Sequence, residues 1–335
     1  MSVSIRDVAK EAGVSLATVS KVLNSRAGSR IASSTQTRVR ETAALLGYLP
    51  NKFAQSMAVR RTNTVALLIS GLQNPFFLHI LEESEKLLMA GGYQAIVDAA
   101  PSVNGTYVSH GKMSGWPVDG VLMWAGVNQK ATDILGAPAT ELPVVYLGYP
   151  REDDSSWVAF DLYQGGALAA DFLISKGHTD IGFIHPWDTN QMSRFPAYSG
   201  FADRCRKVDV RLRTFGTVRQ EETQRSGRET GLLVASMPPE TRPKAIFCHN
   251  DVIAIGVYHG LIRGGVRVPE DIALIGFDGT EEGQCLDKPL TSVLTPVDVF
   301  CRHAVDVLMN RLAGTVELSP DRILVPAELL IGETA

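Results

Sequence analysis

The sequence predicts two kinds of structure in one chain: a small all-α head of three helices with a helix-turn-helix, and a larger α/β core of two doubly wound parallel-sheet lobes. Two observations support this prediction. Over residues 5–46 the apolar residues recur at helical spacing, whereas from residue 63 onward short runs of Val, Ile and Leu alternate with helical segments. A chain of 335 residues is long enough for two or three domains, each with its own core.

The head begins with two short amphipathic helices within residues 5–24, IRDVAKEAGVSLATVSKVLN. Ile5 and Val8 share one face, Gly13 suits the tight turn, and Ser15 has the side chain of an N-cap for the second helix. In a helix-turn-helix, the second helix enters the major groove of DNA with its N-terminal residues at base edges. The pattern therefore predicts a DNA-binding head.

A third helix is predicted over residues 33–46, with Ser33 or Ser34 as its N-cap and Gly47 just beyond its end. It would close a small core over the first two helices. Residues 51–59, NKFAQSMAV, are compatible with a further helix, but a helix this short is marginal in isolation. We therefore expect this segment to fold only on binding.

The net charge of −4 is unevenly distributed along the chain. Residues 1–62 contain ten Lys and Arg but only three Asp and Glu, so this part carries +7 and the remainder carries −11. A basic segment joined to an acidic body is typical of a nucleic-acid-binding module attached to a globular domain. Charge alone can cluster by chance, but here the basic segment coincides with the helix-turn-helix pattern.

From residue 63 the sequence is typical of an α/β protein. Helices fit between most of the buried strands, as at residues 77–90, 165–176 and 251–264. This alternation predicts parallel sheets covered on both faces, which bind ligands at the carboxyl ends of their strands. The predicted strands are 64–70, 93–97, 120–124, 144–147, 180–185, 245–248 and 272–276.

The remaining composition limits the compartment and the chemistry. The four cysteines are widely spaced without a CxxC pair, which is typical of free thiols in a reducing compartment. The first residues lack the apolar stretch of a signal peptide, and no run approaches the ~20 apolar residues of a membrane span. We therefore expect a cytoplasmic protein without a membrane partner. Because Walker, GxGxxG, GxSxG and HExxH motifs are missing, we predict no enzymatic activity, no catalytic residues, no metal and no cofactor.

The motifs of the chain resemble those of the LacI/GalR (lactose-repressor-like) family of bacterial transcription regulators. The resemblance covers the whole chain, and the order and spacing of the motifs make it specific. These motifs are IRDVAKEAGVSLATVSKVLN, LGYLPNKFAQSMA, QNPFF, AGGY, VDGVLMW, FDLYQGGALAADFLISKGHTDIGFI, CHNDVIAIG, VPEDIALIGFD and PLTSVLTPV.

The resemblance implies a domain organisation. It comprises a DNA-binding head at 1–48, a hinge at 49–62, and an effector-binding and dimerisation core at 63–335 that is similar to periplasmic sugar-binding proteins. The N-terminal lobe of the core would hold about 63–160 and 292–319, and the C-terminal lobe about 161–291 and 320–335. The family forms at least homodimers, and the end of this chain shows no tetramerising heptads, which favours a dimer.

By position, the resemblance implies that Leu16 and Ala17 contact base edges, with Lys21 one turn later. Leu and Ala can contact thymine methyl groups, and Lys can donate to guanine O6 and N7. The alternative is that Leu16 and Ala17 belong to the core of the head. The polar side chains suited to phosphates are Ser15, Thr18, Ser20 and Asn24.

In the hinge, the family normally has a Leu that wedges between base pairs in the minor groove, and Met57 occupies that position here. Met is apolar and adaptable, so it can serve as the wedge. The alternative is a Met that only packs against its dimer mate. The other hinge residues expected at the DNA are Asn51, Ala54, Gln55 and Ala58.

The family binds its effector between the two lobes. The matching positions include Phe76 as an apolar wall, Asp161 and Asp278 as acceptors for hydroxyls or amines, and Asn250. For the two Asp residues, the alternative is a structural cap or an inter-lobe hydrogen bond.

Two departures from the family pattern affect this site. Ala197 replaces an Arg that the family uses to bind ligand, and Arg194 could substitute only if the loop repacks. Gly148-Tyr149 replaces a polar pair, and Tyr149 could stack on a ligand. These changes leave open an atypical sugar, a nucleoside-like effector or no effector.

The sequence thus predicts a transcriptional repressor that binds a palindromic double-stranded operator as a homodimer and responds to a small molecule, with a sugar or sugar-like effector favoured. Two other classes are possible on the fold alone. A solute-binding protein is disfavoured by the basic head and the missing export signal, and an α/β enzyme by the missing catalytic motifs.

Overall fold

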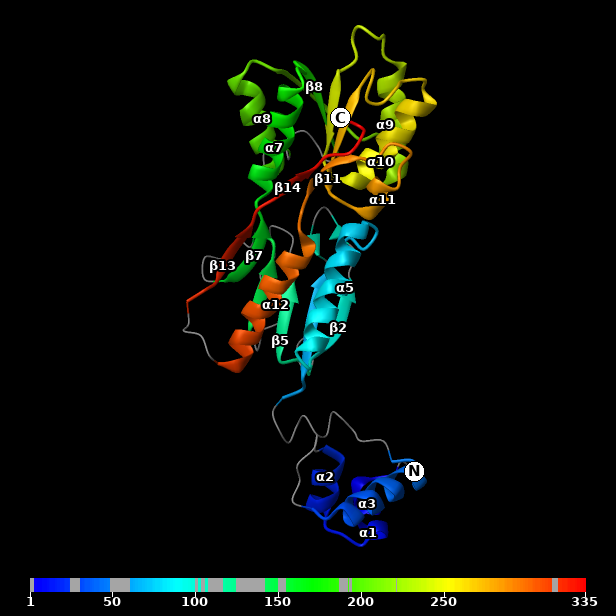
Figure 1. Cartoon of the computed structure of the whole chain (residues 1–335), viewed down its shortest axis with the longest axis vertical. Helices are drawn as coiled ribbons and strands as arrows, with labels where there is room; N and C mark the ends of the chain where they lie inside the picture. The colour runs from blue at the N-terminus through cyan, green and yellow to red at the C-terminus, as the bar shows by residue number, and fades with distance from the viewer. Residues whose placement is uncertain are drawn as a thin grey trace. The chain divides into compact units, whose positions relative to one another are not determined.

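The computed structural model describes residues 3–24, 31–48, 61–99, 102–103, 106–107, 117–124, 142–149, 155–186, 192, 195–220, 222–314 and 319–335. The chain divides into two compact units, Met1–Thr62 and Asn63–Ala335. The described residues of the first unit form three helices, and the second unit contains both large sheets (Figure 1).

The head unit contains the three predicted helices, α1 (Ile5–Ala12), α2 (Leu16–Asn24) and α3 (Ser33–Leu45). Their core is aliphatic, because the apolar positions at helical spacing converge between the three helices. Its buried residues are Val8, Ala9, Ala12, Val19, Val22, Val39 and Ala43.

The predicted ends of these helices are confirmed in part. Gly13 ends α1 in the left-handed region with φ of 64°, and the Ser15 hydroxyl accepts a hydrogen bond from the Thr18 amide at 3.2 Å. Gly47 also lies in the left-handed region beyond α3. The predicted serine cap of α3 is wrong, because Ala32 is the N-cap and both serines lie within the helix.

The first large sheet is entirely parallel, with strand order β13-β7-β6-β5-β1-β2. On one face, Val65, Leu67 and Ile69 pack with helices α5 (Pro75–Ala90) and α12 (Val297–Ala313), which lie side by side in Figure 1. The alternating residues Ala66 and Leu68 pack on the other face. The strands are β1 (Thr64–Ile69), β2 (Gln94–Ala99), β5 (Gly120–Met123), β6 (Val144–Leu147), β7 (Ser156–Phe160) and β13 (Arg322–Val325).

The second large sheet has the order β14-β12-β11-β10-β8-β9, and only the β12–β14 pair is antiparallel. Helices α7 and α8 pack on one face and α9 and α10 on the other (Figure 1). The strands are β8 (Asp180–His185), β9 (Arg211–Gly216), β10 (Ala245–Cys248), β11 (Ala273–Asp278), β12 (Thr291–Leu294) and β14 (Glu328–Leu330). The helices are α7 (Leu162–Ser175), α8 (Pro196–Lys207), α9 (Gln224–Ser236), α10 (Asp251–Arg263) and the short α11 (Glu281–Gln284). The two-residue strands β3 (Ser102–Val103) and β4 (Thr106–Tyr107) form a separate antiparallel pair.

Each half of the core has its own sheet, and we call these halves the first lobe and the second lobe. The predicted lobe boundaries at residues 292 and 320 are wrong. Strand β12 belongs to the second sheet beside β11, and β13 belongs to the first sheet beside β7. The physical reason is that a short apolar strand fits either sheet, and only its pairing partner decides which one it joins. The chain therefore crosses between the lobes near residues 161, 296 and 326.

Helices α9 and α10 approach each other at glycines. A Cβ atom added at Gly227 would lie 2.4 Å from the Ile253 carbonyl oxygen, and one added at Gly256 would lie 2.2 Å from the Gln224 carbonyl oxygen. Gly231 and Gly260 repeat this contact one turn further along. The backbones of the two helices are therefore in direct contact, and the helices cover their face of the second sheet as one closely packed pair.

Candidate DNA-binding and effector sites

The N-terminal part of α2 presents the predicted base-reading residues to solvent. Leu16 is 45% exposed, and Ala17 and Lys21 are also exposed, whereas Val19 and Val22 on the opposite side are buried. This contradicts the alternative that Leu16 and Ala17 belong to the core of the head. Ser15, Thr18 and Ser20 share this end of the helix, and the Ser15 and Thr18 hydroxyls lie 2.9 Å apart.

Asn24 is the last residue of α2. Six further predicted site residues lie outside the described part of the chain, namely Asn51, Ala54, Gln55, Met57, Ala58 and Arg194.

In the core, the carboxyl ends of both sheets lie on the inter-lobe side. Strand β7 runs through Asp161 into α7 of the second lobe, and β13 runs into β14. In the opposite direction, β12 runs into α12 of the first lobe. Because the strands within each sheet are parallel apart from β14, these crossings bring the carboxyl ends of the two sheets to the same boundary.

Asp278 ends β11 at this boundary. Its Oδ2 accepts a hydrogen bond from Asn74 Nδ2 of the first lobe at 3.3 Å, so the predicted alternative of an inter-lobe hydrogen bond is present in the structure. Burial and the charge of Asp251 raise the pKa of the Asp278 carboxyl well above its ordinary value. Its φ of 112° lies in a region that non-glycine residues rarely adopt, and such strain is typical of functional sites.

Asn250 follows β10 and caps α10, because its Oδ1 accepts from the Ile253 amide at 2.9 Å. Asn250 is therefore the N-cap, and Asp251 is the first residue of the helix. Asp251 is buried behind the site, where its carboxylate accepts from the Ser292 hydroxyl at 2.6 Å and the Thr280 amide at 2.7 Å. Burial raises its pKa to about 6 despite these hydrogen bonds.

Glu222 is a further polar residue beside Asn250 that sequence reasoning missed. Its Oε2 accepts from Asn250 Nδ2 at 3.3 Å, and its Oε1 lies 3.7 Å from His249 Nε2. The Glu222 side chain is 41% exposed. Glu222 does not directly follow a strand or a recognised motif, so its position beside Asn250 depends on the fold of the segment between β9 and α9.

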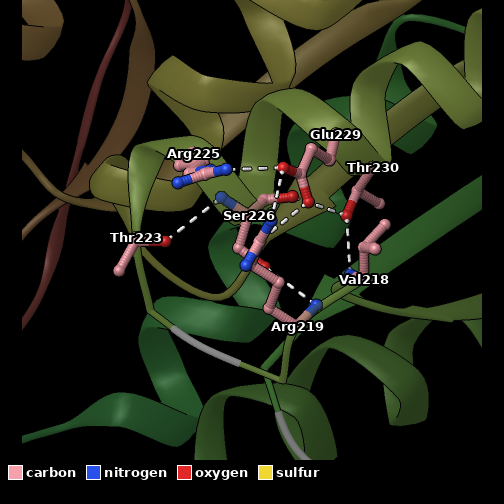
Figure 2. A network of polar contacts seen from close by, with 7 residues as sticks. All are labelled: Val218, Arg219, Thr223, Arg225, Ser226, Glu229 and Thr230. Atoms are coloured by element: carbon pink, nitrogen blue, oxygen red, sulfur yellow. Dashed lines mark hydrogen bonds and ion pairs between the residues drawn. The ribbon is translucent and has the colours of Figure 1, made fainter.

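A network of polar contacts holds the β9–α9 loop against α9 (Figure 2). The Arg219 guanidinium donates to both carboxylate oxygens of Glu229 at 2.9 and 3.1 Å, and the Arg219 amide donates to Ser226. The Val218 amide donates to the Thr230 hydroxyl, and Thr223 caps α9 through the Ser226 amide. The loop that carries Glu222 is thus tied to its helix at both ends.

On the first lobe, the corresponding boundary is aromatic. Phe76 is only 7% exposed and lies within a cluster of rings that also includes Phe77, Trp124, Phe160 and Phe300. Phe160 stacks on Phe300 with ring centroids 4.3 Å apart. Most of the Phe76 ring therefore packs within the protein rather than forming an open wall.

Tyr149 and Asp161 have partners within the protein. The Tyr149 hydroxyl donates to the Phe160 carbonyl at 3.1 Å, and burial together with the charge of Asp161 raises its pKa to about 12. Its ring is 38% exposed and lies 5.4 Å from the Trp157 ring. Asp161 caps α7 by accepting from the Gln164 amide at 2.9 Å, which is its predicted structural alternative. Ala197, in the place of the expected Arg, is fully buried in α8.

Among the described residues, none of the helices combines the length and the hydropathy of a membrane span. The same residues contain no group of three or more His, Cys, Asp or Glu arranged to hold a metal ion.

Comparison with protein families matches both units of the chain. Residues 4–51 match the lacI family of bacterial regulatory proteins, and residues 170–335 match a periplasmic binding protein-like domain. The ribose operon repressor of Escherichia coli strain K12 is 30% identical over 316 residues, which cover 92% of this chain and 93% of the repressor. The transcriptional repressor PurR of Pectobacterium atrosepticum is 28% identical and covers 94% of this chain and 92% of PurR.

Solved structures show the same fold. The lac repressor dimer bound to operator and the anti-inducer ONPF superimposes with a TM-score of 0.81 at 22% identity, covering 100% of this chain and 99% of the repressor chain. The complex of the transcriptional regulator CelR with cellobiose gives a TM-score of 0.68 at 25% identity, covering 99% and 100%. Together, the helix-turn-helix head and the two-lobed core define a DNA-binding regulator with a periplasmic-binding-protein-like core. The chain belongs to the lacI family of bacterial regulatory proteins.

Proposed function

We propose that this chain is a sequence-specific transcriptional repressor that binds a palindromic operator as a homodimer in the cytoplasm and has no enzymatic activity. The observation that supports this best is the exposed face of α2, where Leu16, Ala17 and Lys21 are available to a partner. The curated relatives, which match nearly the whole chain, are named as repressors.

Recognition of the operator would combine methyl contact with one strong hydrogen-bond donor. Leu16 and Ala17 would contact thymine methyl groups, and Lys21 would donate to a guanine. The polar residues Ser15, Thr18, Ser20 and Asn24 would bind phosphates, which position the helix without reading sequence. In the hinge, Met57 would wedge into the minor groove, with Asn51, Ala54, Gln55 and Ala58 alongside it.

The effector would bind between the lobes, in contact with Asp278 and Asn250, while Phe76, Tyr149 and Arg194 would lie at the margin. The described ionisable groups around Asp278 are the acids Asp251 and Glu222, and His249 lies beside Glu222. Such a site accepts hydrogen bonds and repels anions. It therefore favours a neutral, hydroxyl-rich molecule such as a sugar, or an amine-bearing one. Asp161 would act mainly as the cap of α7.

The experiment that tests the proposed function starts from the DNA. Binding sites selected from random duplexes by the full chain should converge on a palindrome, and gel shift at moderate salt should show a specific complex. Lys21→Ala should weaken that complex by about 1–3 kcal/mol and relax the preference at one base pair in each half-site.

Lys10→Ala is the matched control, because Lys10 is also exposed but lies in α1. It should weaken binding to all sequences equally, if at all. If no palindrome emerges, or if the two variants behave alike, the proposed recognition is wrong.

A further inference from the structure

The two lobes are joined by three crossings of the chain that are tied to one another. The Asp161 amide donates to the Val325 carbonyl at 2.8 Å, which links the first crossing to the third. The amide and hydroxyl of Thr295, in the second crossing, donate to the Asp278 carbonyl at 3.3 and 3.1 Å. The backbone of Asp278 is therefore held at the base of the inter-lobe connection.

A fourth link joins the lobes through side chains. Asn74 and Asp278 are 204 positions apart in the sequence and meet at 3.3 Å, with Asn74 only 6% exposed. The Asn74 amide group is oriented by its own helix, because its Oδ1 caps α5 by accepting from the Phe76 amide at 3.0 Å. The Asn74 side chain thus accepts a hydrogen bond from the first lobe through its oxygen and donates one to the second lobe through its nitrogen.

On the second-lobe side of this link, the Asp278 carboxyl is buried near two other acids and its backbone is strained. Asp278 adopts a φ of 112°, and the acids that face it are Asp251 from α10 and Glu222 from the β9–α9 loop. Asn74 contributes the amide donor from α5. Burial and these two carboxylates raise the pKa of Asp278, and the hydrogen bond from Asn74 acts in the opposite direction because it stabilises the ionised carboxylate. Strained groups of this kind persist when the surrounding structure fixes them.

We propose that Asn74 and Asp278 form a latch that holds the two lobes together in the effector-free chain. The idea deepens the proposed function, because the latch occupies the acceptor that an effector would use. A hydroxyl or amine of the effector that binds Asp278 at Oδ2 would replace the Asn74 amide there, so effector binding and the inter-lobe contact would be coupled through one carboxyl group. Strand β1 begins at Thr64, directly after the expected hinge, and leads into α5, so the first lobe is the part of the core that directly follows the hinge in sequence.

Asn74 both caps α5 and donates to Asp278, and three variants of the full chain distinguish these two roles. Asn74→Ser keeps an oxygen that can cap α5 but lacks an amide that reaches Asp278. Asn74→Asp also keeps the cap but places a second carboxylate against Asp278. Gln73→Glu is the control, since it adds the same charge at the exposed neighbouring position.

The measurement is hydrogen exchange of the effector-free protein at pH 5 and pH 8, corrected for intrinsic rates. In Asn74→Ser, the amides of Thr295 and Gly279 should exchange about fivefold faster at both pH values, the size expected for one lost hydrogen bond. In Asn74→Asp, exchange should be faster than in Asn74→Ser at pH 8 and close to wild type at pH 5, where the two carboxyls can share a proton.

Wild-type protection in both Asn74 variants would overturn the latch, as would an Asn74→Asp effect that is the same at both pH values. If Gln73→Glu increased hydrogen exchange equally, the added charge alone would explain the result, and this outcome would also overturn the latch. Because no DNA is present, this outcome is independent of the gel-shift test of the proposed function.

Discussion

The two lobes of the core place opposite chemistry at their shared boundary. In the first lobe the carboxyl ends of the strands meet an aromatic cluster of Phe76, Trp124, Phe160 and Phe300. In the second lobe they meet ionisable and amide side chains, namely Asp278, Asn250, Glu222 and His249. The comparison indicates a division of roles, in which the first lobe supplies a rigid apolar surface and the second supplies the hydrogen-bonding groups.

The lobes also differ in how their helices pack. Helix α12 packs on the first sheet through large side chains such as Phe300. Helices α9 and α10 of the second lobe meet at glycines. Substitutions should therefore destabilise the first lobe by leaving cavities and the second lobe by forcing α9 and α10 apart, and the following predictions test this difference.

The largest effect is expected for Phe160→Ala in the first lobe. This side chain is almost fully buried and stacks on Phe300, so its removal leaves a cavity and should cost about 3–5 kcal/mol of folding stability. Urea denaturation of the full chain followed by circular dichroism would measure the loss. A stable Phe160→Ala protein with an altered effector response would instead mean that the aromatic cluster is part of the binding surface.

The second-largest effect is expected for Gly256→Ala in the second lobe. The new methyl group would meet the Gln224 carbonyl, so α9 and α10 must separate, and we expect a loss of about 1–3 kcal/mol. Arg263→Ala, at the exposed end of the same helix, is the control and should change stability by less than about 0.5 kcal/mol. Equal denaturation midpoints for the two variants would show that the helices tolerate the added atom.

Asp278→Asn should change how stability depends on pH. The folded-state pKa of Asp278 is raised, so its protonated form favours folding, and this contribution is lost as the pH rises through that pKa. The variant should therefore be more stable than wild type at pH 8, by about 1 kcal/mol or more, with a smaller difference at pH 5.

For Asp271→Asn we expect the opposite dependence of stability on pH. The hydrogen bonds from Arg267 lower the pKa of Asp271, so its contribution to stability is present at neutral pH and is lost as the pH falls. Denaturation midpoints should be measured from pH 2 to pH 8. The difference between Asp278→Asn and wild type should grow as the pH rises above the ordinary pKa of Asp, whereas the difference between Asp271→Asn and wild type should be constant there and shrink as the pH falls below it. Parallel profiles would contradict the assignment of Asp278 as a strained buried acid.

The smallest effect is expected for Tyr149→Phe. The variant loses one hydrogen bond to the Phe160 carbonyl from a half-buried side chain, which should cost about 0.5–1.5 kcal/mol. Thermal denaturation would measure this change. A much larger loss would show that this hydroxyl, rather than the aromatic rings, fixes the end of β7.

Much of the architecture could be predicted because its signals are local. The helices of the head, the strands from 64–70 to 272–276 and the left-handed glycines at 13 and 47 follow from periodicity and turn chemistry within a few residues. Asp278 and Asn250 were expected at the effector site from the family resemblance, and both lie at the carboxyl ends of strands, β11 and β10. The cap of α3 was missed because Ser33 and Ser34 have side chains that favour N-caps, whereas the structure begins the helix after Ala32, which makes no side-chain cap.

The sequence by itself determined the fold class, the helix-turn-helix and the family of the chain, because periodic apolar residues and ordered motifs are properties of contiguous segments. The tertiary structure alone decided three features: which sheet β12 and β13 join, the approach of Glu222 to Asn250, and the contact between Asn74 and Asp278. Each of these joins segments that are distant in sequence. Which strands pair, and which side chains meet between the lobes, depends on the folded arrangement of the whole chain. A pattern within one segment therefore cannot predict them.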